Sequence, residues 1–563
     1  MRRIVVMAAT EAGIHCAAEV KTALPQAEVN ILLPAGASDT ARTAPVRQLQ
    51  GPARPDDDFL AALDLSCIET SEGTLDFENS TFALTSSRGS LSIRFTEIVL
   101  EIPVQARLPR QLTSAANAFP LPVRGFRQPA KALEEALAGA ASAPVLVVGS
   151  GMPALEAIFL ALDSGAPQVL FAETPLTSAP PLEPHLQSCL LLRLADRVRH
   201  VVCAGPAATA LSFTLASDGG SLKAVQINGE APVAVSMCLW ADTLMARHPV
   251  LREEGFILDD KGCITGTEAQ PAHVHLAGSG MALPPATLAC GIQLPRYAGS
   301  AEVADLAAKV AASVISEIEI GGQSCYGTRG ARMEGFGVYR TGLTGKEAQA
   351  AGVSAEQATL TLVLPPAETG CAAGQARMSL TLVAHKESKT LIGASILAEG
   401  PCNTAAQALL SLALEALSCA TPLDILAVRE HTGRAAGLFS ACARRLLDKI
   451  HGPIQGITPD EFNASVDAGA DFFLLDVREA VDWHKGHLPE AHNIPVGQLK
   501  KRLSSECPRF VPFVIVCKTG DLAFETARRI SWLGAKDLYV LDGGMDLWPY
   551  PSVLLNTNSA GGN

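Results

Sequence analysis

The alternation of apolar runs with small and polar residues predicts two βαβ units in the first third of the chain. The apolar run Ile4–Met7 is typical of a buried parallel strand, and a helix over 17–24 and a strand over 29–33 complete the first unit. The second unit begins with the apolar run Pro144–Val148, passes through a glycine turn into a helix, and ends with the strand Val169–Glu173. Each unit therefore indicates an α/β domain of the nucleotide-binding type.

The hydrophobic pattern changes in the second half of the chain. Strands over Thr359–Leu364 and Met378–Ala384, followed by the apolar helix Ala405–Leu417, predict an α+β module. A short Gly/Pro linker over Gly452–Gly456 then introduces a final domain, whose first helix begins with the capping signal Thr458–Glu461. We therefore expect several domains rather than one core.

Composition and charge narrow the classes of function. The 563 residues are 48% hydrophobic and 18% charged, which suits compact α/β domains. The formal net charge of -13 argues against nucleic acid as a partner, because phosphate-binding surfaces need clustered Lys and Arg. No segment reaches the length of a membrane span, and the 14 cysteines are scattered without C-x-x-C pairs or zinc spacing. We therefore expect a soluble cytoplasmic protein with no membrane partner and no metal site.

Four motifs follow one another in the last domain. In chain order they are Asp476–Glu479 after a strand, Gly486–Pro495, Cys517–Asp521 after a second strand, and Asp542–Met545. Together they resemble the rhodanese family over roughly residues 455 to 550. The resemblance implies that Cys517 accepts a sulfane sulfur and passes it on as a persulfide.

Elementary electrostatics supports Cys517 independently of the resemblance. The cysteine lies between the strand Phe513–Val516 and a predicted helix over 522–533, so it faces free backbone amides and the positive end of a helix dipole. These donors favour a thiolate or a persulfide anion, and Lys518 adds a positive charge. The alternative is an inert cysteine at a strand end. The predicted sulfur site comprises Cys517, Lys518, Thr519, Gly520, Asp521 and Leu522.

Other residues of the last domain modify this prediction. Active rhodaneses often carry a second basic residue late in the loop, where this chain has Asp521 and Leu522. An anionic donor is therefore disfavoured relative to a neutral or protein-bound persulfide. His487 and His492 are candidates for general bases, but the resemblance places them in a structural turn. The Asp476–Arg478 pair is expected to brace the loop.

Over almost its whole length the chain resembles the pyridine nucleotide-disulfide oxidoreductases, in particular the coenzyme A disulfide reductase type with a C-terminal rhodanese domain. The order of the units carries the resemblance, together with Thr341–Thr344, Glu347–Ala348 and Gly352. It implies an α/β fold with two Rossmann-like βαβ nucleotide-binding-type domains, an α+β dimerisation domain and a C-terminal rhodanese-like α/β domain. The implied boundaries are 1–108 with 250–324 for the FAD-binding-like domain, 109–249 for the NAD(P)-binding-like domain, 325–451 for the dimerisation-like domain and 455–552 for the rhodanese-like domain.

In that family electrons pass from a nicotinamide to a flavin to a cysteine, and the nicotinamide site is partly present. Gly149 and Gly151 allow close approach of a pyrophosphate, and Ala154 permits tight helix packing. Glu173 ends the second strand, where it can meet a ribose, whereas Pro153 in the first helical turn is unusual. Two interpretations stay open: an NAD(P) site, or a glycine turn kept only for folding.

The flavin site departs from the family at three places. The turn Ala8–Gly13 keeps only its last glycine, Leu32–Pro34 lacks an acidic residue for the ribose, and Ser279 stands where the family has an aspartate. The redox cysteine is missing too, because residues 34–66 contain no cysteine and Cys16 lies in the first helix. We therefore predict a fold retained without flavin electron transfer, and FAD is not expected as a cofactor.

Three functions are consistent with these features. The first is a sulfur carrier or sulfurtransferase that uses a Cys517 persulfide, loaded by a small-molecule or protein-bound persulfide donor. The second is an FAD-dependent NAD(P)H oxidoreductase that reduces a disulfide, persulfide or polysulfide. The third is a catalytically inactive scaffold subunit. We prefer the first, and the apolar helix Ala405–Leu417 predicts a homodimer.

Overall fold

The computed structural model describes most of the chain. Outside the described residues lie 35–61, 122–132, 176–180, 247–255, 259–263, 268–272, 296–300, 318–324, 366–375, 533–536 and 552–563, together with gaps of one to three residues. The chain divides into two compact units. Unit 1 contains Met1–Pro181, Asp196–Ala286 and Gln293–Met333, and unit 2 contains Leu182–Ala195, Thr287–Ile292 and Glu334–Asn563.

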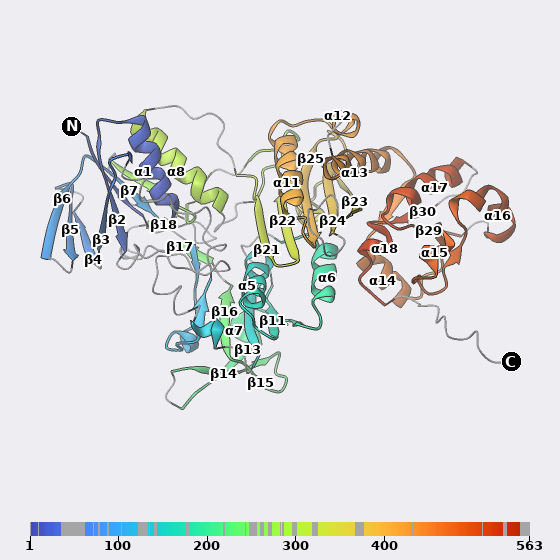
Figure 1. Ribbon diagram of the computed structural model, residues 1–563, viewed down its shortest axis with the longest axis horizontal. Coiled ribbons are helices and arrows are strands. Elements are labelled where there is room, and N and C mark those ends of the chain that lie inside the picture. The colour runs from blue at the N-terminus through green and yellow to red at the C-terminus, as the bar shows by residue number, and fades with distance from the viewer. Residues whose placement is uncertain are drawn as a thin grey trace. The chain divides into compact units, whose positions relative to one another are not determined.

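The first sheet of unit 1, of which β2, β3 and β7 are labelled in Figure 1, has five parallel strands in the order β20–β7–β1–β2–β3. These strands are β1 (Arg3–Met7), β2 (Glu28–Pro34), β3 (Ser66–Thr70), β7 (Glu97–Glu101) and β20 (Val274–Ala277). Helices α1 (Glu11–Ala23) and α8 (Ala301–Ser316) pack on one face. A small antiparallel sheet is formed by β4 (Glu72–Asp76), β5 (Thr81–Ser86) and β6 (Gly89–Arg94).

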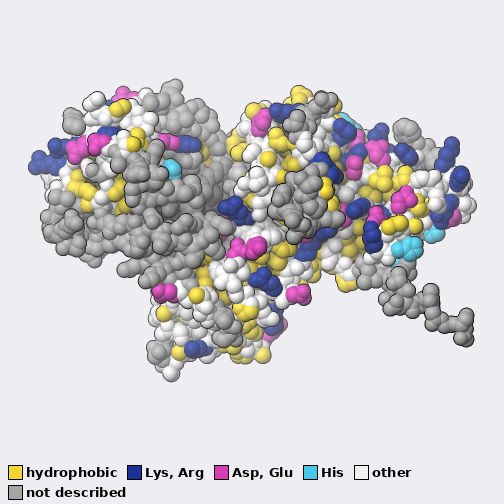
Figure 2. Space-filling view, viewed as in Figure 1, with side chains coloured by type: hydrophobic (Ala, Val, Ile, Leu, Met, Phe, Trp, Pro, Cys, Tyr) yellow, Lys and Arg dark blue, Asp and Glu magenta, His cyan; other side chains and the backbone are white. Residues whose placement is uncertain are grey.

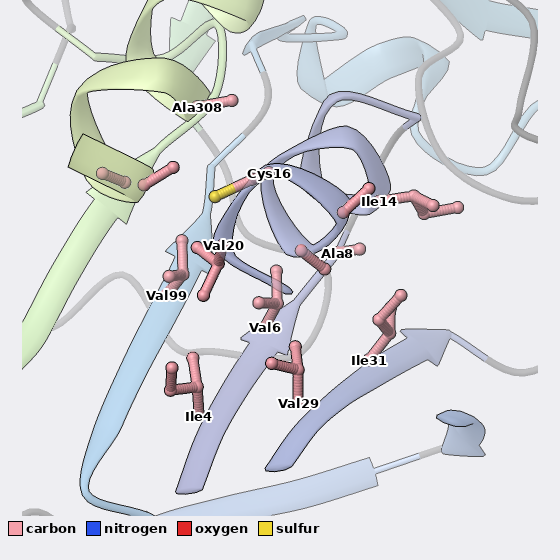
Figure 3. Packing of buried hydrophobic residues seen from close by; sticks show 14 of the residues in the cluster. Ile4, Val6, Ala8, Ile14, Cys16, Val20, Val29, Ile31, Val99 and Ala308 are labelled. Atoms are coloured by element: carbon pink, nitrogen blue, oxygen red, sulfur yellow. The ribbon is translucent and has the colours of Figure 1, made fainter. Parts of the chain in front are cut away.

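The side chains of β1 show how this sheet is buried on both faces. Ile4 and Val6 face α1 and α8, as the packing in Figure 3 shows. Val5 and Met7 face the opposite side and pack with Phe82 of β5. Successive residues of a strand point to opposite faces, so a continuous apolar run is what a strand covered on both sides requires. The predicted first βαβ unit is therefore present.

The second sheet of unit 1 also has five parallel strands, in the order β12–β11–β10–β16–β9. They are β9 (Ala118–Pro120), β10 (Val145–Gly149), β11 (Val169–Glu173), β12 (Val198–Val202) and β16 (Met237–Ala241). Helix α5 (Gly151–Asp163) connects β10 to β11, and nearly all of its residues are buried. A small antiparallel sheet of β13 (Leu211–Leu215), β14 (Leu222–Ile227) and β15 (Val233–Ala234) lies nearby in sequence.

Unit 2 contains an antiparallel sheet in which β22, β25, β24 and β23 follow one another. Their bounds are β22 (Phe336–Gly342), β23 (Ala355–Leu364), β24 (Ala376–His385) and β25 (Leu391–Glu399). The helices of this part are α6 (Pro184–Arg193), α9 (Gly345–Ala350), α11 (Asn403–Ser418), α12 (Leu423–Val428) and α13 (Arg434–His451). Leu438, Cys442 and Leu446 recur every four residues along α13 and bury its inner face, as expected for an amphipathic helix.

The C-terminal part of unit 2 is a five-stranded parallel sheet in the order β26–β30–β29–β27–β28. Its strands are β26 (Ile454–Ile457), β27 (Phe473–Asp476), β28 (His492–Asn493), β29 (Phe513–Val516) and β30 (Leu538–Leu541). Its helices are α14 (Pro459–Asp467), α15 (Ala480–Trp483), α16 (Leu499–Glu506), α17 (Asp521–Trp532) and α18 (Gly544–Leu547). The predicted linker over 452–456 is shorter than expected, because β26 begins at Ile454 and pairs with β30.

Two kinds of feature would indicate a broad class of function: a helix that can span a membrane and a cluster of residues that can hold a metal ion. Within the described ranges, no helix is both long and apolar enough to cross a membrane. In the same ranges, no group of three or more His, Cys, Asp or Glu residues is placed to hold a metal ion. On the face shown in Figure 2, Lys and Arg side chains are interspersed with Asp and Glu side chains.

Candidate functional site

Cys517 lies at the junction between the end of β29 and the start of α17. The strand ends at Val516, the helix begins at Asp521, and the turn between them bends around the sulfur. The Gly520 N–H donates to Cys517 Sγ at 3.1 Å. The cysteine is 1% exposed. The strand, turn and helix predicted around this residue are therefore present, and a backbone donor faces the sulfur.

Burial and backbone donors act on the Cys517 thiol in opposite directions. Burial raises the pKa of the thiol, because the charged form loses its hydration. The backbone amides of Thr519, Gly520, Leu522 and Ala523 lower the pKa, since they stabilise a sulfur anion. The net pKa lies above the ordinary value. The expected anion-stabilising amides are in place, but burial outweighs them in the arrangement described.

A glycine turn fixes the other side of the loop. The amides of Met545 and Asp546 donate to the carbonyl oxygens of Cys517 and Lys518, at 2.9 and 2.8 Å. Gly544 has a φ of +61°, and a Cβ there would lie 2.6 Å from each of those two carbonyl oxygens. The predicted closing motif Asp542–Met545 therefore holds the sulfur loop through its backbone, and its second glycine leaves no room for a side chain.

The remaining predicted residues of the loop lie at its rim. Lys518 and Leu522 are exposed, and Thr519 uses its carbonyl oxygen as an acceptor for the Thr361 N–H at 3.2 Å. Asp521 is the first residue of α17, and its Oδ1 accepts from Arg445 Nε at 2.7 Å. The negative charge of Asp521, which was expected to disfavour an anionic donor, is therefore balanced by Arg445, a cation from outside the C-terminal sheet.

Arg445 was missed by the sequence analysis. It comes from α13, also pairs with Glu525 at 2.9 Å, and lies 5.2 Å from the centre of the Phe524 ring. The signal in the sequence was weak: a basic residue on a helix that precedes the last domain. Only folding brings it to Asp521, which is 76 residues away.

Three other polar residues of the last domain, Arg478, His487 and His492, contact side chains of the same domain. Arg478 donates to Asp476 with an Nη2–Oδ2 distance of 2.7 Å, so the predicted pairing is confirmed, while its effect on the sulfur loop stays a prediction. His487 stacks on Trp483 with ring centroids 3.7 Å apart. His492 pairs with Glu506 at 2.9 Å. These contacts agree with a structural place for both histidines.

Comparison with known proteins identifies the last domain. The family model for the rhodanese-like domain matches residues 458–549. Thiosulfate sulfurtransferase GlpE of Pseudomonas savastanoi pv. phaseolicola is 31% identical over 97 residues, a match that covers 16% of this chain and 84% of that protein. This segment belongs to the rhodanese-like family. YrkF of Bacillus subtilis is 30% identical over 95 residues, or 17% of this chain, and the rhodanese-like domain spans 51% of that protein.

Solved structures resemble the chain over nearly its whole length. The structure of reduced CoADR-RHD from Bacillus anthracis covers 97% of both chains, with a TM-score of 0.75 and 16% identity. The structure of an NAD-dependent persulfide reductase from A. fulgidus covers 97% of this chain and all of its own, with a TM-score of 0.75 and 17% identity. The fold is therefore that of a pyridine nucleotide-disulfide oxidoreductase body followed by the rhodanese-like domain.

The turn between β10 and α5 keeps the backbone shape that a dinucleotide requires. Gly149 and Gly151 have φ values of +149° and +62°, and a Cβ on Gly149 would lie 2.8 Å from the backbone of Ala241. Ser150 precedes the helix, and its side chain makes no capping hydrogen bond. Glu173 ends β11 beside this turn and pairs with His200 at 2.6 Å. The residues present fit a nucleotide, for which the turn would hold the phosphates and Glu173 would hold a ribose.

The start of α1, which follows β1, has an acceptor within the protein. Glu101, at the end of β7, is fully buried, and its Oε2 accepts from the Gly13 N–H at 2.9 Å. A Cβ on Gly13 would lie 2.3 Å from the same oxygen. A carboxyl group of the protein thus occupies the space beside the first turn of α1. The sequence analysis missed Glu101, although an acidic residue ending the apolar strand Glu97–Glu101 was a visible signal.

The other two predicted departures, at Ser279 and at Leu32–Leu33 of the second strand, lie at buried positions. Ser279, which stands in place of the family's aspartate, is 1% exposed and accepts from the Val104 N–H at 3.1 Å. Gly278 has a φ of +99°, and a Cβ there would lie 2.5 Å from the Ile102 carbonyl oxygen. Leu32 and Leu33 are buried. Of the predicted damaged turn, residues 9 and 10 lie outside the described part, as does segment 35–61, so no step is assigned to FAD.

Proposed function

We propose that the chain is a sulfur carrier or sulfurtransferase that holds a persulfide on Cys517. The observation that supports the proposal most directly is the Gly520 N–H, 3.1 Å from Cys517 Sγ at the start of α17. Amides at the start of a helix favour an anion, and a persulfide places its negative charge on a sulfur atom one bond beyond Sγ. The match to the rhodanese-like family and the similarity to thiosulfate sulfurtransferase GlpE support the same chemistry.

The loading step needs no cofactor. The Cys517 thiolate attacks the outer sulfur of a persulfide R–S–SH, and the S–S bond of the donor breaks. R–SH leaves with the proton, and the anion Cys517–S–S⁻ remains in the loop. Because the sulfur moves as a neutral atom between two thiol groups, no external oxidant or reductant takes part.

The test is direct detection of the added sulfur. Full-length protein is treated with a low-molecular-weight persulfide or with thiosulfate, and the Cys517 peptide is examined by mass spectrometry, with cyanolysis as a second readout. We expect one added sulfur on Cys517 and none in Cys517→Ser. Cys507→Ser, which changes another cysteine of the same domain, should load like the wild type. Absence of an adduct with every donor, from a thiol that alkylates after unfolding, would reject the proposal.

A second element of the proposal is NAD(P) binding at the start of α5. The glycine turn and Glu173 support it, as does the similarity of the fold to the NAD-dependent persulfide reductase of A. fulgidus. Nicotinamide fluorescence during titration with NADH and NADPH measures it. We expect binding that Glu173→Ala weakens by about tenfold, the loss of one good polar contact. The exposed Glu230→Ala is the control, and no signal with either nucleotide would contradict the proposal.

We also propose a homodimer. Ile425 and Val428 of α12 are 52% and 74% exposed, which is unusual for two large apolar side chains on one short helix. Light scattering on the purified protein measures the mass. A monomer at micromolar concentration would contradict this part of the proposal.

A further inference from the structure

The Cys517 loop contacts a strand that lies outside the rhodanese-like domain. Strand β23 is the edge strand of the antiparallel sheet of unit 2. Its Thr361 N–H donates to the Thr519 carbonyl oxygen at 3.2 Å, and the Gly543 N–H donates to the Thr359 carbonyl oxygen at 2.9 Å. An edge strand presents a row of backbone groups that can pair with another segment. Here it pairs with both sides of the sulfur loop.

Side-chain packing at the same place leaves the sulfur little access. Gly520 has a φ of +93°, and a Cβ there would lie 3.3 Å from both Leu360 Cδ2 and the Thr359 carbonyl oxygen. The loop is therefore enclosed between β23 and the turn that contains Gly544. Cys517 is 1% exposed in this arrangement. A donor or acceptor carried by another protein cannot contact the side of the loop that β23 covers while these contacts persist.

Helix α13 contacts the loop through two cations. Arg445, 7% exposed, pairs with Asp521 at 2.7 Å and with Glu525 at 2.9 Å. One turn later, Lys449 pairs with Asp542 at 2.7 Å and donates to the Gln357 carbonyl oxygen at 3.0 Å. Asp521 follows the sulfur loop in sequence and Asp542 precedes the glycine turn, so Arg445 holds the end of the loop and Lys449 holds the turn that packs against it.

We propose that these contacts form a latch, defined as Thr359–Thr361 of β23 with Arg445 and Lys449 of α13, which keeps the Cys517 loop closed until the rhodanese-like domain is released. The inference rests on the sulfur chemistry proposed above. In the latched state the thiol is stored, and in the released state it exchanges sulfur with a protein-bound donor or acceptor. A population shift between two arrangements of a small interface is enough, because such interfaces open at modest cost.

Charged groups of both signs surround the docked loop and its neighbours, and burial is the largest influence on the pKa of the thiol. The cationic groups are Lys518, Arg445, Lys449, Arg193 and Arg377, and the acidic groups are Asp521, Glu525, Asp448, Asp542, Asp546, Asp482, Glu356 and Glu399. Burial raises the pKa of Cys517, whereas the loop amides lower it. Release exposes to water the side of the loop that contacts β23 and keeps the loop amides, so we expect the released thiol to ionise at lower pH.

The experiment measures the alkylation rate of Cys517 in the full-length protein with a small reagent, iodoacetamide, and a large one, a maleimide on polyethylene glycol. In Arg445→Met we expect about a tenfold rise in rate, because loss of two ion pairs increases the released population. The rise should be greater for the large reagent, and the pH at half-maximal rate should fall. Arg429→Met, which breaks the exposed Arg429–Glu415 pair, should leave the rate unchanged.

A second variant tests the strand without disturbing any charge. Thr361→Pro removes the N–H that donates to Thr519, and an edge strand tolerates proline where its N–H points outward. Thr361→Val, which keeps the N–H, is its control. Rates equal to wild type in both Arg445→Met and Thr361→Pro, with unchanged circular dichroism, would overturn the latch, as would a wild-type thiol as reactive as an unstructured peptide. Alkylation needs no sulfur donor, so a failure of sulfur loading leaves this result interpretable.

Discussion

The junctions β1–α1 and β29–α17 use the same geometry for different purposes. In each, a buried parallel strand ends, the chain turns, and an amide in the first turn of the next helix or just before it donates to an acceptor inside the protein. At α1 the Gly13 N–H donates to Glu101 Oε2 at 2.9 Å, and at α17 the Gly520 N–H donates to Cys517 Sγ at 3.1 Å. The helix start provides an anion site in both cases, and the residue that fills it decides what the site can do.

The difference lies in whether the acceptor can change. Glu101 is fixed by the register of β7 against β20 and is fully buried, so the first junction has a permanent internal acceptor. Cys517 is a nucleophile whose sulfur can gain and lose a second sulfur atom. The same fold element therefore has a fixed internal acceptor in the front domain and a nucleophile in the rhodanese-like domain.

The largest contrast should appear in the reactivity of the two thiols near these junctions. Burial, and then the Glu101 carboxylate, raise the pKa of Cys16 in α1, and no helix amide opposes them among the main causes. Burial also raises the pKa of Cys517, but loop amides oppose it. Alkylation requires the thiolate, so its rate increases with pH for both. We expect Cys517 to react in the folded protein as pH rises above the ordinary thiol pKa, and Cys16 to react only on unfolding.

Mass spectrometry of both peptides across a pH series measures this contrast. The denatured protein serves as the reference in which the two thiols should react alike. Equal rates for Cys16 and Cys517 in the folded protein would show that the loop amides do not distinguish the second junction from the first.

The next effect is steric and concerns the turn that holds the sulfur loop. In Gly544→Ala the new Cβ would meet the Cys517 and Lys518 carbonyl oxygens at 2.6 Å, at a positive φ. Strain and overpacking together should destabilise the observed position of the Cys517 loop by about 3 kcal/mol. Because the loop is then displaced, a smaller fraction of Cys517 should gain a sulfur atom than in the wild type. Gly497→Ala is the control, because a Cβ there meets nothing within 4 Å. Normal loading in Gly544→Ala would show that loop position is not set by this turn.

The sequence predicted much of both junctions, because their strands and helices depend on local pattern. Strand Phe513–Val516 was predicted with its observed bounds, and the helix after it differs by one residue at each end. The Thr458–Glu461 cap was also predicted, since a capping box is encoded within four residues. Glu101 and Arg445 were not predicted, because they meet Gly13 and Asp521 across 88 and 76 residues. Long-range pairing of a carboxylate depends on register and docking, which periodicity does not reveal.

A moderate effect should follow from removing the Glu101 carboxyl group from the start of α1. Glu101→Ala leaves the Gly13 N–H without this acceptor in a buried position, which should destabilise α1 by about 2 kcal/mol. Glu101→Gln keeps a carbonyl oxygen and should cost less. Hydrogen exchange of the α1 amides reports the local change, which a single unfolding transition of this multidomain chain would obscure. Exchange as slow in Glu101→Ala as in the wild type would mean that Glu101 is not what satisfies the helix start.

The smallest effect concerns the start of α14, where the backbone amide of Glu461 is bonded by a local capping box and not by a distant carboxyl group or a cysteine sulfur. At α14 the Thr458 Oγ1 accepts from the Glu461 N–H at 3.3 Å, and Glu461 Oε2 accepts from the Thr458 N–H at 2.9 Å. Thr458→Ala should increase hydrogen exchange in α14 by an amount equivalent to about 1 kcal/mol, with Thr458→Ser close to wild type. Glu461 is exposed, so water can replace part of the lost bond. If Thr458→Ala lost as much protection from exchange as Glu101→Ala, burial would not explain why the Glu101 contact is expected to stabilise its helix more than a local capping box does.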